Sequence, residues 1–138
     1  MKIFLESIHG DLNFKGTNER GQSLHFSGNK EAVSPMESVL MAVAACSAID
    51  VEMILKKMRQ NVTDVKVEVS GVRADAVPAV FTKIDLHYII SGDLKEEKGI
   101  KAVEMSMNEY CSVSKMLAHS VEIGFTVEVR PDQWNEQM

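Results

Sequence analysis

The residues of this chain best suited to chemistry are its two cysteines, Cys46 and Cys111. Two thiols that meet in a folded protein can carry a redox cycle. One is oxidised to a sulfenic acid, and the other condenses with it to a disulfide. Two inert core cysteines are the alternative, because free cysteine is among the most buried residue types. The residues fit both interpretations.

The neighbours of the two thiols differ. Cys46 stands one helical turn before Asp50, so both side chains lie on one helix face, where an acid opposes thiolate formation. Cys111 follows Tyr110 and begins a short helical pattern, with Lys115 close behind it. Thiols at helix N-termini tend to have a lowered pKa, so the local sequence favours a lowered pKa for Cys111.

The first cysteine lies in a helix with a clear start. Ser34 is a good N-cap, Pro35 fits the first helical position, and Glu37 completes a capping box. We expect this helix to run from Pro35 to about Met58. Residues 39–49 leave no polar face, and a helix that is apolar all round is buried on every side. Either a sheet wrapped around it or a second subunit must cover it.

The remaining pattern predicts an α+β fold in one domain, residues 1–138. A strand has apolar side chains at alternate positions, whereas a helix repeats them every three or four residues. We expect an antiparallel meander of strands at residues 2–8, 11–16 and 22–27, long strands at 62–75 and 79–91, helices at 94–110 and 111–119, a strand at 121–129 and an exposed tail at 130–138.

Composition excludes several classes of function. The net charge of −5 disfavours a nucleic-acid or anionic-membrane partner. Apolar runs are too short for a membrane span, and there is no signal-peptide pattern, so we expect a cytoplasmic protein with no membrane partner. We expect no metal and no cofactor, because the chain lacks zinc-type cysteine spacing and its histidines do not cluster. These are His9, His25, His87 and His119.

Two segments of the chain resemble a known family. Ser-Pro-Met-Glu at 34–37 and Ala-Ala-Cys-Ser-Ala-Ile-Asp at 44–50, together with Tyr-Cys-Ser-Val-Ser-Lys-Met-Leu at 110–117, resemble the OsmC/Ohr superfamily, in particular its YhfA-like branch. The resemblance covers nearly the whole chain. It implies an intertwined homodimer, in which antiparallel sheets wrap around long central helices that bear the first cysteine, with a site at the subunit interface.

The resemblance also implies a function, a thiol-dependent peroxidase in oxidative-stress defence. Cys46 would attack a small organic hydroperoxide or hydrogen peroxide, and Cys111 would resolve the sulfenic acid to a disulfide. An external dithiol would then reduce the disulfide. No cofactor is implied.

The sequence departs from this family pattern near the first cysteine. The well-studied branches have a glutamate directly after the proline, paired with an arginine that polarises the thiolate. Here Met36 holds that position, the acid is Glu37, and Arg20 in a predicted turn is the N-terminal arginine that could serve. Two alternatives to a peroxidase remain on the same fold. One is a dimer that binds a small hydrophobic ligand or senses redox state, and the other is a purely structural dimer.

Overall fold

The computed structural model describes residues 1–131 and has a mixed α+β fold, as the sequence predicts. The chain forms two compact units, residues 1–39 and residues 40 onward. In chain order its elements are β1 (Ile3–Ser7), β2 (Asn13–Asn18), β3 (Ser23–Ser27), α1 (Pro35–Lys57), β4 (Asn61–Arg73), β5 (Phe81–Asp93), α2 (Glu96–Met105), η1 (Ser106–Tyr110), α3 (Ser112–Leu117) and β6 (Glu122–Arg130).

The first unit contains the antiparallel meander expected from the sequence. β1 pairs with β2 and β2 with β3, so that Phe14 lies opposite Phe26. The apolar side chains of β1 remain largely outside any core, since Ile3, Phe4 and Leu5 are each more than half exposed. This strand therefore presents apolar surface that the other described residues of the first unit do not cover.

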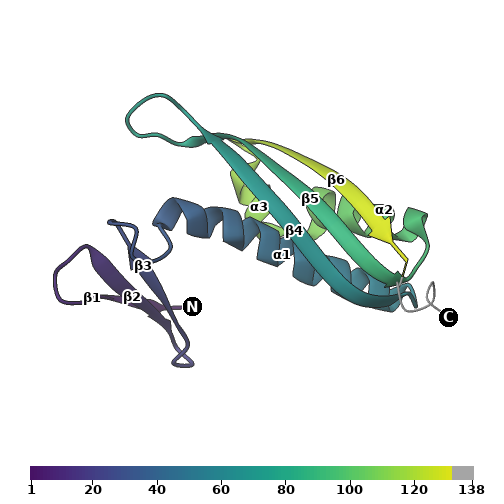
Figure 1. Ribbon diagram of the computed structural model, residues 1–138, viewed down its shortest axis with the longest axis horizontal. Coiled ribbons are helices and arrows are strands. Elements are labelled where there is room, and N and C mark those ends of the chain that lie inside the picture. Colours follow the sequence, from purple (N-terminus) through teal and green to yellow (C-terminus); the bar gives the residue numbers. More distant parts are fainter. Residues whose placement is uncertain (132–138) are drawn as a thin grey trace. The chain divides into compact units, whose positions relative to one another are not determined.

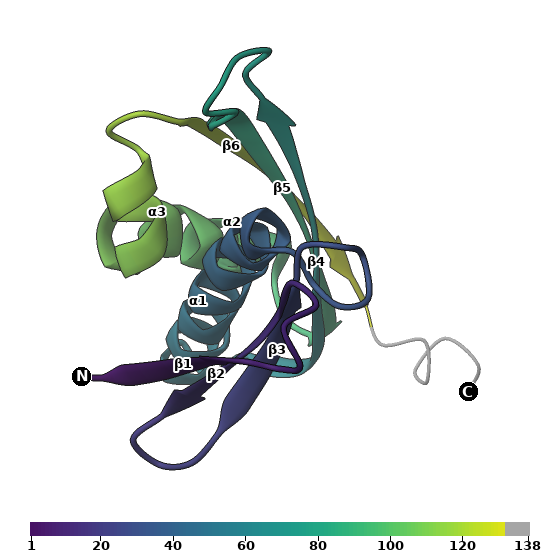
Figure 2. The same cartoon turned by 90° about the vertical axis from the view of Figure 1, so that its left-hand side faces the viewer.

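The second unit is a three-stranded sheet with helices on one face (Figures 1 and 2). β5 lies in the centre, antiparallel to β4 and parallel to β6. Side chains alternate between the two faces of a strand, and on β5 the inward set Ile84, Leu86, Tyr88 and Ile90 is buried. The core of this unit therefore lies between β5 and the helices.

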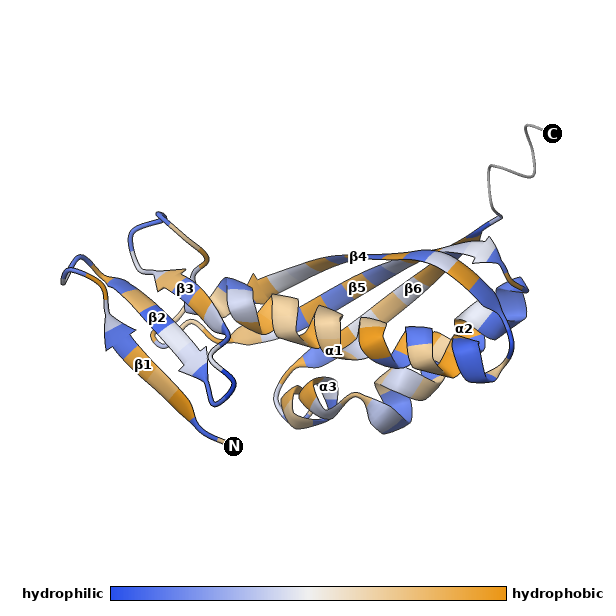
Figure 3. Ribbon diagram, turned by 90° about the horizontal axis from the view of Figure 1, so that it is seen from below, coloured by the Kyte–Doolittle hydropathy of each residue, from blue (hydrophilic) through white to orange (hydrophobic). Residues whose placement is uncertain are grey.

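Within the described residues of the second unit, helix α1 buries one stripe of its surface. Val43, Ser47, Val51 and Leu55 recur every four residues and are buried, as expected for one face of a helix. Met41, Ile49 and Met53 are more than half exposed, and Figure 3 shows the apolar character of this helix. The expected burial on all sides is therefore not supplied by the described residues of the second unit.

The apolar composition of α1 also bears on whether this helix could span a membrane. By length and composition alone this 23-residue helix could cross a bilayer. The expectation of no membrane partner therefore receives no support from helix length. The central helix of a water-soluble assembly has the same composition when other elements cover it.

The segment around Cys111 differs from the sequence prediction. The helix expected at 94–110 is α-helical only from Glu96 to Met105, and its last turn, η1, is a π-helix. Cys111 has extended backbone angles and caps α3 instead of lying within a helix. The extra residue in the π turn causes the break, because the Cys111 N–H donates to the Ser106 carbonyl five positions back, at 2.7 Å.

The final strand begins and ends one residue later than expected. Arg130, predicted to begin an exposed tail, is the last residue of β6. The rest of that tail, residues 132–138, lies outside the described residues.

Candidate functional site

The fold brings the two cysteines together. The sulfur atoms of Cys46 and Cys111 and a carboxylate oxygen of Asp50 all lie within 4.8 Å of one another. Cys46 is half-buried on α1, and Cys111 at the start of α3 is 2% exposed. Two residues far apart in the sequence thus form one cluster with an acid.

Backbone contacts fix the position of Cys111. Its N–H donates to the Ser106 carbonyl, and its sulfur accepts the Ser114 N–H at 3.5 Å. The Ser114 hydroxyl in turn donates to the Cys111 carbonyl at 3.1 Å. The π turn before Cys111 and the first turn of α3 therefore hold this thiol toward α1. A π turn inside a helix is often found at a functional site.

Asp50 is held by a hydroxyl group. The Ser106 side chain donates to Asp50 Oδ2 at 3.0 Å and also contacts the Ser47 carbonyl at 3.3 Å. A half-buried acid needs a partner, for which a cation or a backbone donor is suitable. The structure gives a buried serine from η1 instead, and this serine connects α1 to the segment that carries Cys111.

A buried tyrosine lies behind the cluster. The Tyr88 hydroxyl donates to Ser47 Oγ at 2.7 Å and lies 3.3 Å from the sulfur of Met107. Burial, opposed by the Ser47 hydrogen bond and assisted by Coulombic interactions with Cys111, Asp50 and Cys46, raises the pKa of Tyr88 to about 12. Tyr88 therefore remains a neutral hydrogen-bond donor at ordinary pH.

The structure reverses the prediction for the ionisation of Cys111. Burial raises the pKa of this thiol, and the neighbouring Cys46 thiol raises it too, while the contacts with Ser114 act in the opposite direction. The helix N-terminus that suggested a thiolate is only a short turn, and desolvation outweighs it. Burial therefore favours the neutral thiol form of Cys111.

Glu37 and Arg20 are both occupied within the first unit. Glu37 and Ser34 form the predicted capping box, with bonds of 2.9 and 3.1 Å, and these contacts lower the pKa of Glu37. Arg20 lies in the turn between β2 and β3 and donates from Nε to Gln22 at 3.2 Å. The cluster of Cys46, Asp50 and Cys111 includes neither residue.

A pocket of about 410 Å³ opens beside Asp50. Its wall is mostly apolar, with one lysine, and comes from the last turns of α1 and from the end of α2 and η1. The lining residues are Asp50, Met53, Ile54, Lys57, Met58, Met105 and Tyr110. The pocket gives a small molecule a place next to the acid of the cluster.

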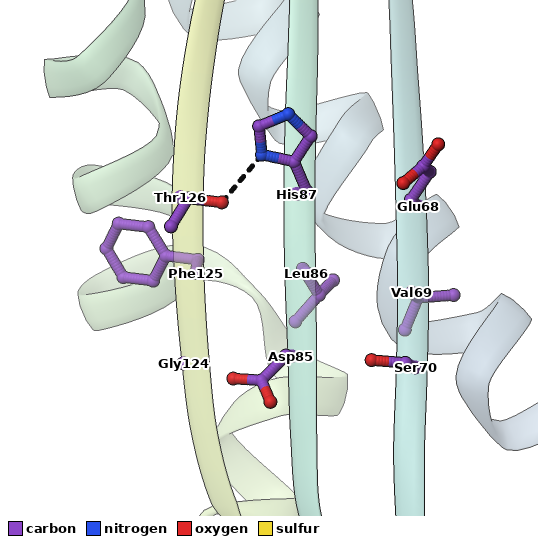
Figure 4. Close-up of a pocket in the computed structure, with 9 residues that line it drawn as sticks. All are labelled: Glu68, Val69, Ser70, Asp85, Leu86, His87, Gly124, Phe125 and Thr126. Carbon is purple, nitrogen blue, oxygen red and sulfur yellow. Dashed lines mark hydrogen bonds between the residues drawn. The ribbon is translucent and has the colours of Figure 1, made fainter.

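The opposite face of the sheet carries a polar groove (Figure 4). There His87 and Thr126 are joined by a 2.6 Å hydrogen bond, and the other ring nitrogen of His87 lies 3.5 Å from Glu128. Asp85, on the same face, pairs with Lys83. These are paired surface groups around a shallow hollow, and the groove contains neither thiol.

The sequence indicates Cys46 and Cys111 as site residues and places Asp50 on the helix face of Cys46, but it does not indicate Ser47, Tyr88 or Ser106. Tyr88 belongs to an alternating strand pattern that indicates only core packing. The single signal for a wider role is chemical, since a buried tyrosine hydroxyl requires a partner. Nothing in the sequence places Ser106 next to Asp50, because the π turn that does so has no spacing signature.

The family model for OsmC-like proteins matches residues 28–126, which include both cysteines. The chain belongs to the OsmC-like family. This confirms the resemblance drawn from the segments around Cys46 and Cys111.

Relatives support the same family and its YhfA-like branch. The chain is 45% identical over 121 residues to protein YhfA of Escherichia coli K12, which covers 86% of this chain and 90% of YhfA. A hypothetical protein from Aquifex aeolicus is 30% identical, with a TM-score of 0.87 over 95% of this chain and 96% of its own. The OsmC-like fold is therefore shown by sequence and structure together.

A more distant neighbour carries a functional name. The structure of an organic hydroperoxide resistance protein OsmC from Legionella pneumophila, also described as a predicted redox protein, has a TM-score of 0.72. It is 17% identical, and the similarity covers 94% of this chain and 98% of that protein. At this identity the likeness shows a common fold.

Proposed function

We propose that this OsmC-like protein is a thiol-dependent peroxidase of oxidative-stress defence, which reduces small organic hydroperoxides or hydrogen peroxide. The observation that carries this proposal is the convergence of the only two cysteines to within 4.8 Å. A disulfide requires about 2.05 Å between sulfurs, so the remaining approach is less than about 3 Å. The hydroperoxide resistance name of the Legionella neighbour agrees with it.

The surroundings of the two thiols assign their roles. Cys46 is the more exposed thiol and attacks the peroxide, whereas the buried Cys111 resolves the product. The Cys46 sulfur takes one peroxide oxygen, the O–O bond breaks, and an alcohol or water leaves. The sulfur of Cys111 then bonds to that of Cys46, and the hydroxyl of the sulfenic acid leaves as water with the Cys111 proton.

An external dithiol completes the cycle by reducing the Cys46–Cys111 disulfide, and the chemistry of the two thiols requires no bound cofactor. Such a cycle suits the cytoplasm, where cysteines are kept reduced. We place the protein there.

The working unit in this proposal is a homodimer. The exposed residues Met41, Ile49 and Met53 form an apolar stripe on α1, and β1 exposes Ile3 and Phe4 as well. Large exposed apolar patches mark interaction surfaces. A second copy of the chain that covers these surfaces gives α1 the burial on all sides that its composition predicts.

The pocket beside Asp50 favours one alternative, a dimer of the same fold that binds a small hydrophobic molecule or senses redox state. Met53, Ile54 and Met105 give this pocket an apolar wall. In a peroxidase the same wall would receive the organic part of a hydroperoxide. Binding of an apolar ligand without any turnover would favour the alternative.

Turnover of cumene hydroperoxide with a dithiol reductant tests the proposal. We expect Cys46→Ser to abolish consumption, and Cys111→Ser to consume about one equivalent and stop with a trappable sulfenic acid. A double variant controls for background. Equal consumption by all four proteins would refute the peroxidase, and retained ligand binding in the inactive double variant would establish the alternative.

A further inference from the structure

We propose that Cys46, Asp50 and Cys111 form a binding site for one Zn²⁺ ion when both thiols are reduced. No metal is expected from the sequence, because these ligands come from distant segments and lack the usual short spacing. Within residues 1–131 these three side chains nevertheless form a converging group of possible metal ligands. Two thiolates and a carboxylate are all ligand types that zinc accepts.

The distances suit a tetrahedral ion. Zinc binds sulfur at about 2.3 Å and carboxylate oxygen at about 2.0–2.2 Å, which puts neighbouring ligand atoms about 3.5–3.8 Å apart. The three ligand atoms here lie within 4.8 Å of one another. Closing the site around an ion therefore requires movements of about 1 Å, which side-chain rotation can supply.

Supporting hydrogen bonds already orient two of the ligands. Ser106 holds one oxygen of Asp50 at 3.0 Å, and a carboxylate has a second oxygen to offer a metal. The Ser114 N–H points at the Cys111 sulfur at 3.5 Å, an arrangement that favours a thiolate once a cation replaces its proton. Contacts of this kind position metal ligands and tune their affinity.

The pocket beside Asp50 provides a route for the ion and space for a fourth ligand. Zinc sites with three protein ligands keep the remaining position for water or a small molecule. Because that pocket reaches the acid of the cluster, water can enter there and complete the coordination.

Zinc binding and disulfide formation would exclude each other, because both use the same two sulfurs. The metal site would therefore hold the pair in its reduced form. A hydroperoxide that takes two electrons from the thiolates gives a disulfide, an alcohol and, with two protons, water, and it releases the ion. This regulatory consequence rests on the proposed peroxidase activity, whereas the binding itself does not.

Cobalt(II) is the probe that tests the site. The full reduced chain, kept free of oxygen, is titrated with Co²⁺, and thiolate-to-cobalt absorption is recorded before Zn²⁺ displaces the cobalt. We expect one ion per chain, with the absorption lost in Cys46→Ser and Cys111→Ser. Asp50→Asn should weaken binding at least about tenfold, and Ser106→Ala by about tenfold. Glu52→Gln, an exposed acid two residues beyond Asp50, is the matched control and should bind normally.

Several outcomes would overturn the proposal. These are less than one ion per reduced chain, absorption retained in either cysteine variant, or Asp50→Asn affinity equal to that of Glu52→Gln. Circular dichroism identifies any cysteine variant that fails to fold. In that case, wild-type protein oxidised with diamide, which has no free thiols, replaces the unfolded variant in the comparison with the reduced wild type. Metal binding by the oxidised protein would also contradict the site. A missing peroxidase activity alongside normal cobalt binding would refute only the proposed function.

Discussion

Replacing Tyr88 by phenylalanine should make the protein less stable at neutral pH and more stable than wild type in alkali. The ring of Tyr88 is fully buried, and its hydroxyl donates to Ser47 at 2.7 Å. Phenylalanine keeps the ring and loses this bond. Because Ser47 keeps its own bond to the Ala44 carbonyl, no buried donor is left unpaired, and we expect a loss of about 1 kcal/mol.

The alkaline effect follows from the pKa of Tyr88, which burial raises from 10.0 to about 12. An unfolded chain loses the phenolic proton first. The stability linked to this proton is therefore complete below pH 10 and is lost as the pH rises toward 12. The difference between these two pKa values corresponds to roughly 3 kcal/mol of stability. Wild type and Tyr88→Phe should therefore exchange their order of stability between about pH 10 and 12.

Urea unfolding of both proteins from pH 7 to pH 12 measures this effect. A second readout uses the tyrosinate absorbance of a Tyr110→Phe protein, in which Tyr88 is the remaining tyrosine. A stability difference that stays constant with pH would refute the reasoning. So would ionisation of Tyr88 near pH 10 in a protein that is still folded.

Three further predictions concern other parts of the chain. Oxidation to the Cys46–Cys111 disulfide closes a loop of about 65 residues and should raise the free energy of unfolding by up to about 4 kcal/mol. The oxidised protein should therefore have a higher urea midpoint than the reduced protein, and an unchanged midpoint would contradict the loop argument. The capping contacts of Glu37 lower its pKa, so the stability that they contribute is lost as the pH falls below about 4.5. The free energy of unfolding of Glu37→Gln should therefore change less with pH in acid than that of wild type. The same pH dependence in both proteins would count against the cap. Gly92 has a φ of 139° and a Cβ there would collide with a backbone carbonyl of β4, so Gly92→Ala should lower stability by about 2–4 kcal/mol in thermal unfolding. Gly21→Ala, at a φ of 83° with open space around it, is the control and should lose less.

Much of the fold could be predicted because its signals are local. The capping box of Ser34 and Glu37 fixes where α1 begins, and alternation along residues 79–91 predicts the central strand. The prediction of a single α-helix at 94–110 was wrong for its last turn, which is a π-helix. A π turn depends on one extra residue accommodated by tertiary contacts, and no periodic pattern records it.

The candidate site could be predicted only in part. Cys46 and Cys111 were found from residue type and family resemblance, but their approach depends on how α1 packs against η1 and α3. The protonation of Cys111 was predicted in the wrong direction, because the sequence shows a helix start and does not show burial. For Asp50, the local spacing predicts the helix face it shares with Cys46, whereas its partner Ser106 comes from a distant segment.

The most direct test of the two-cysteine cycle is the intact mass of the reduced protein after one equivalent of cumene hydroperoxide. We predict the prompt loss of two hydrogens per chain, about 2 Da, with peptide mapping to a Cys46–Cys111 disulfide. An unchanged mass, with both thiols still titratable after unfolding, would contradict the account.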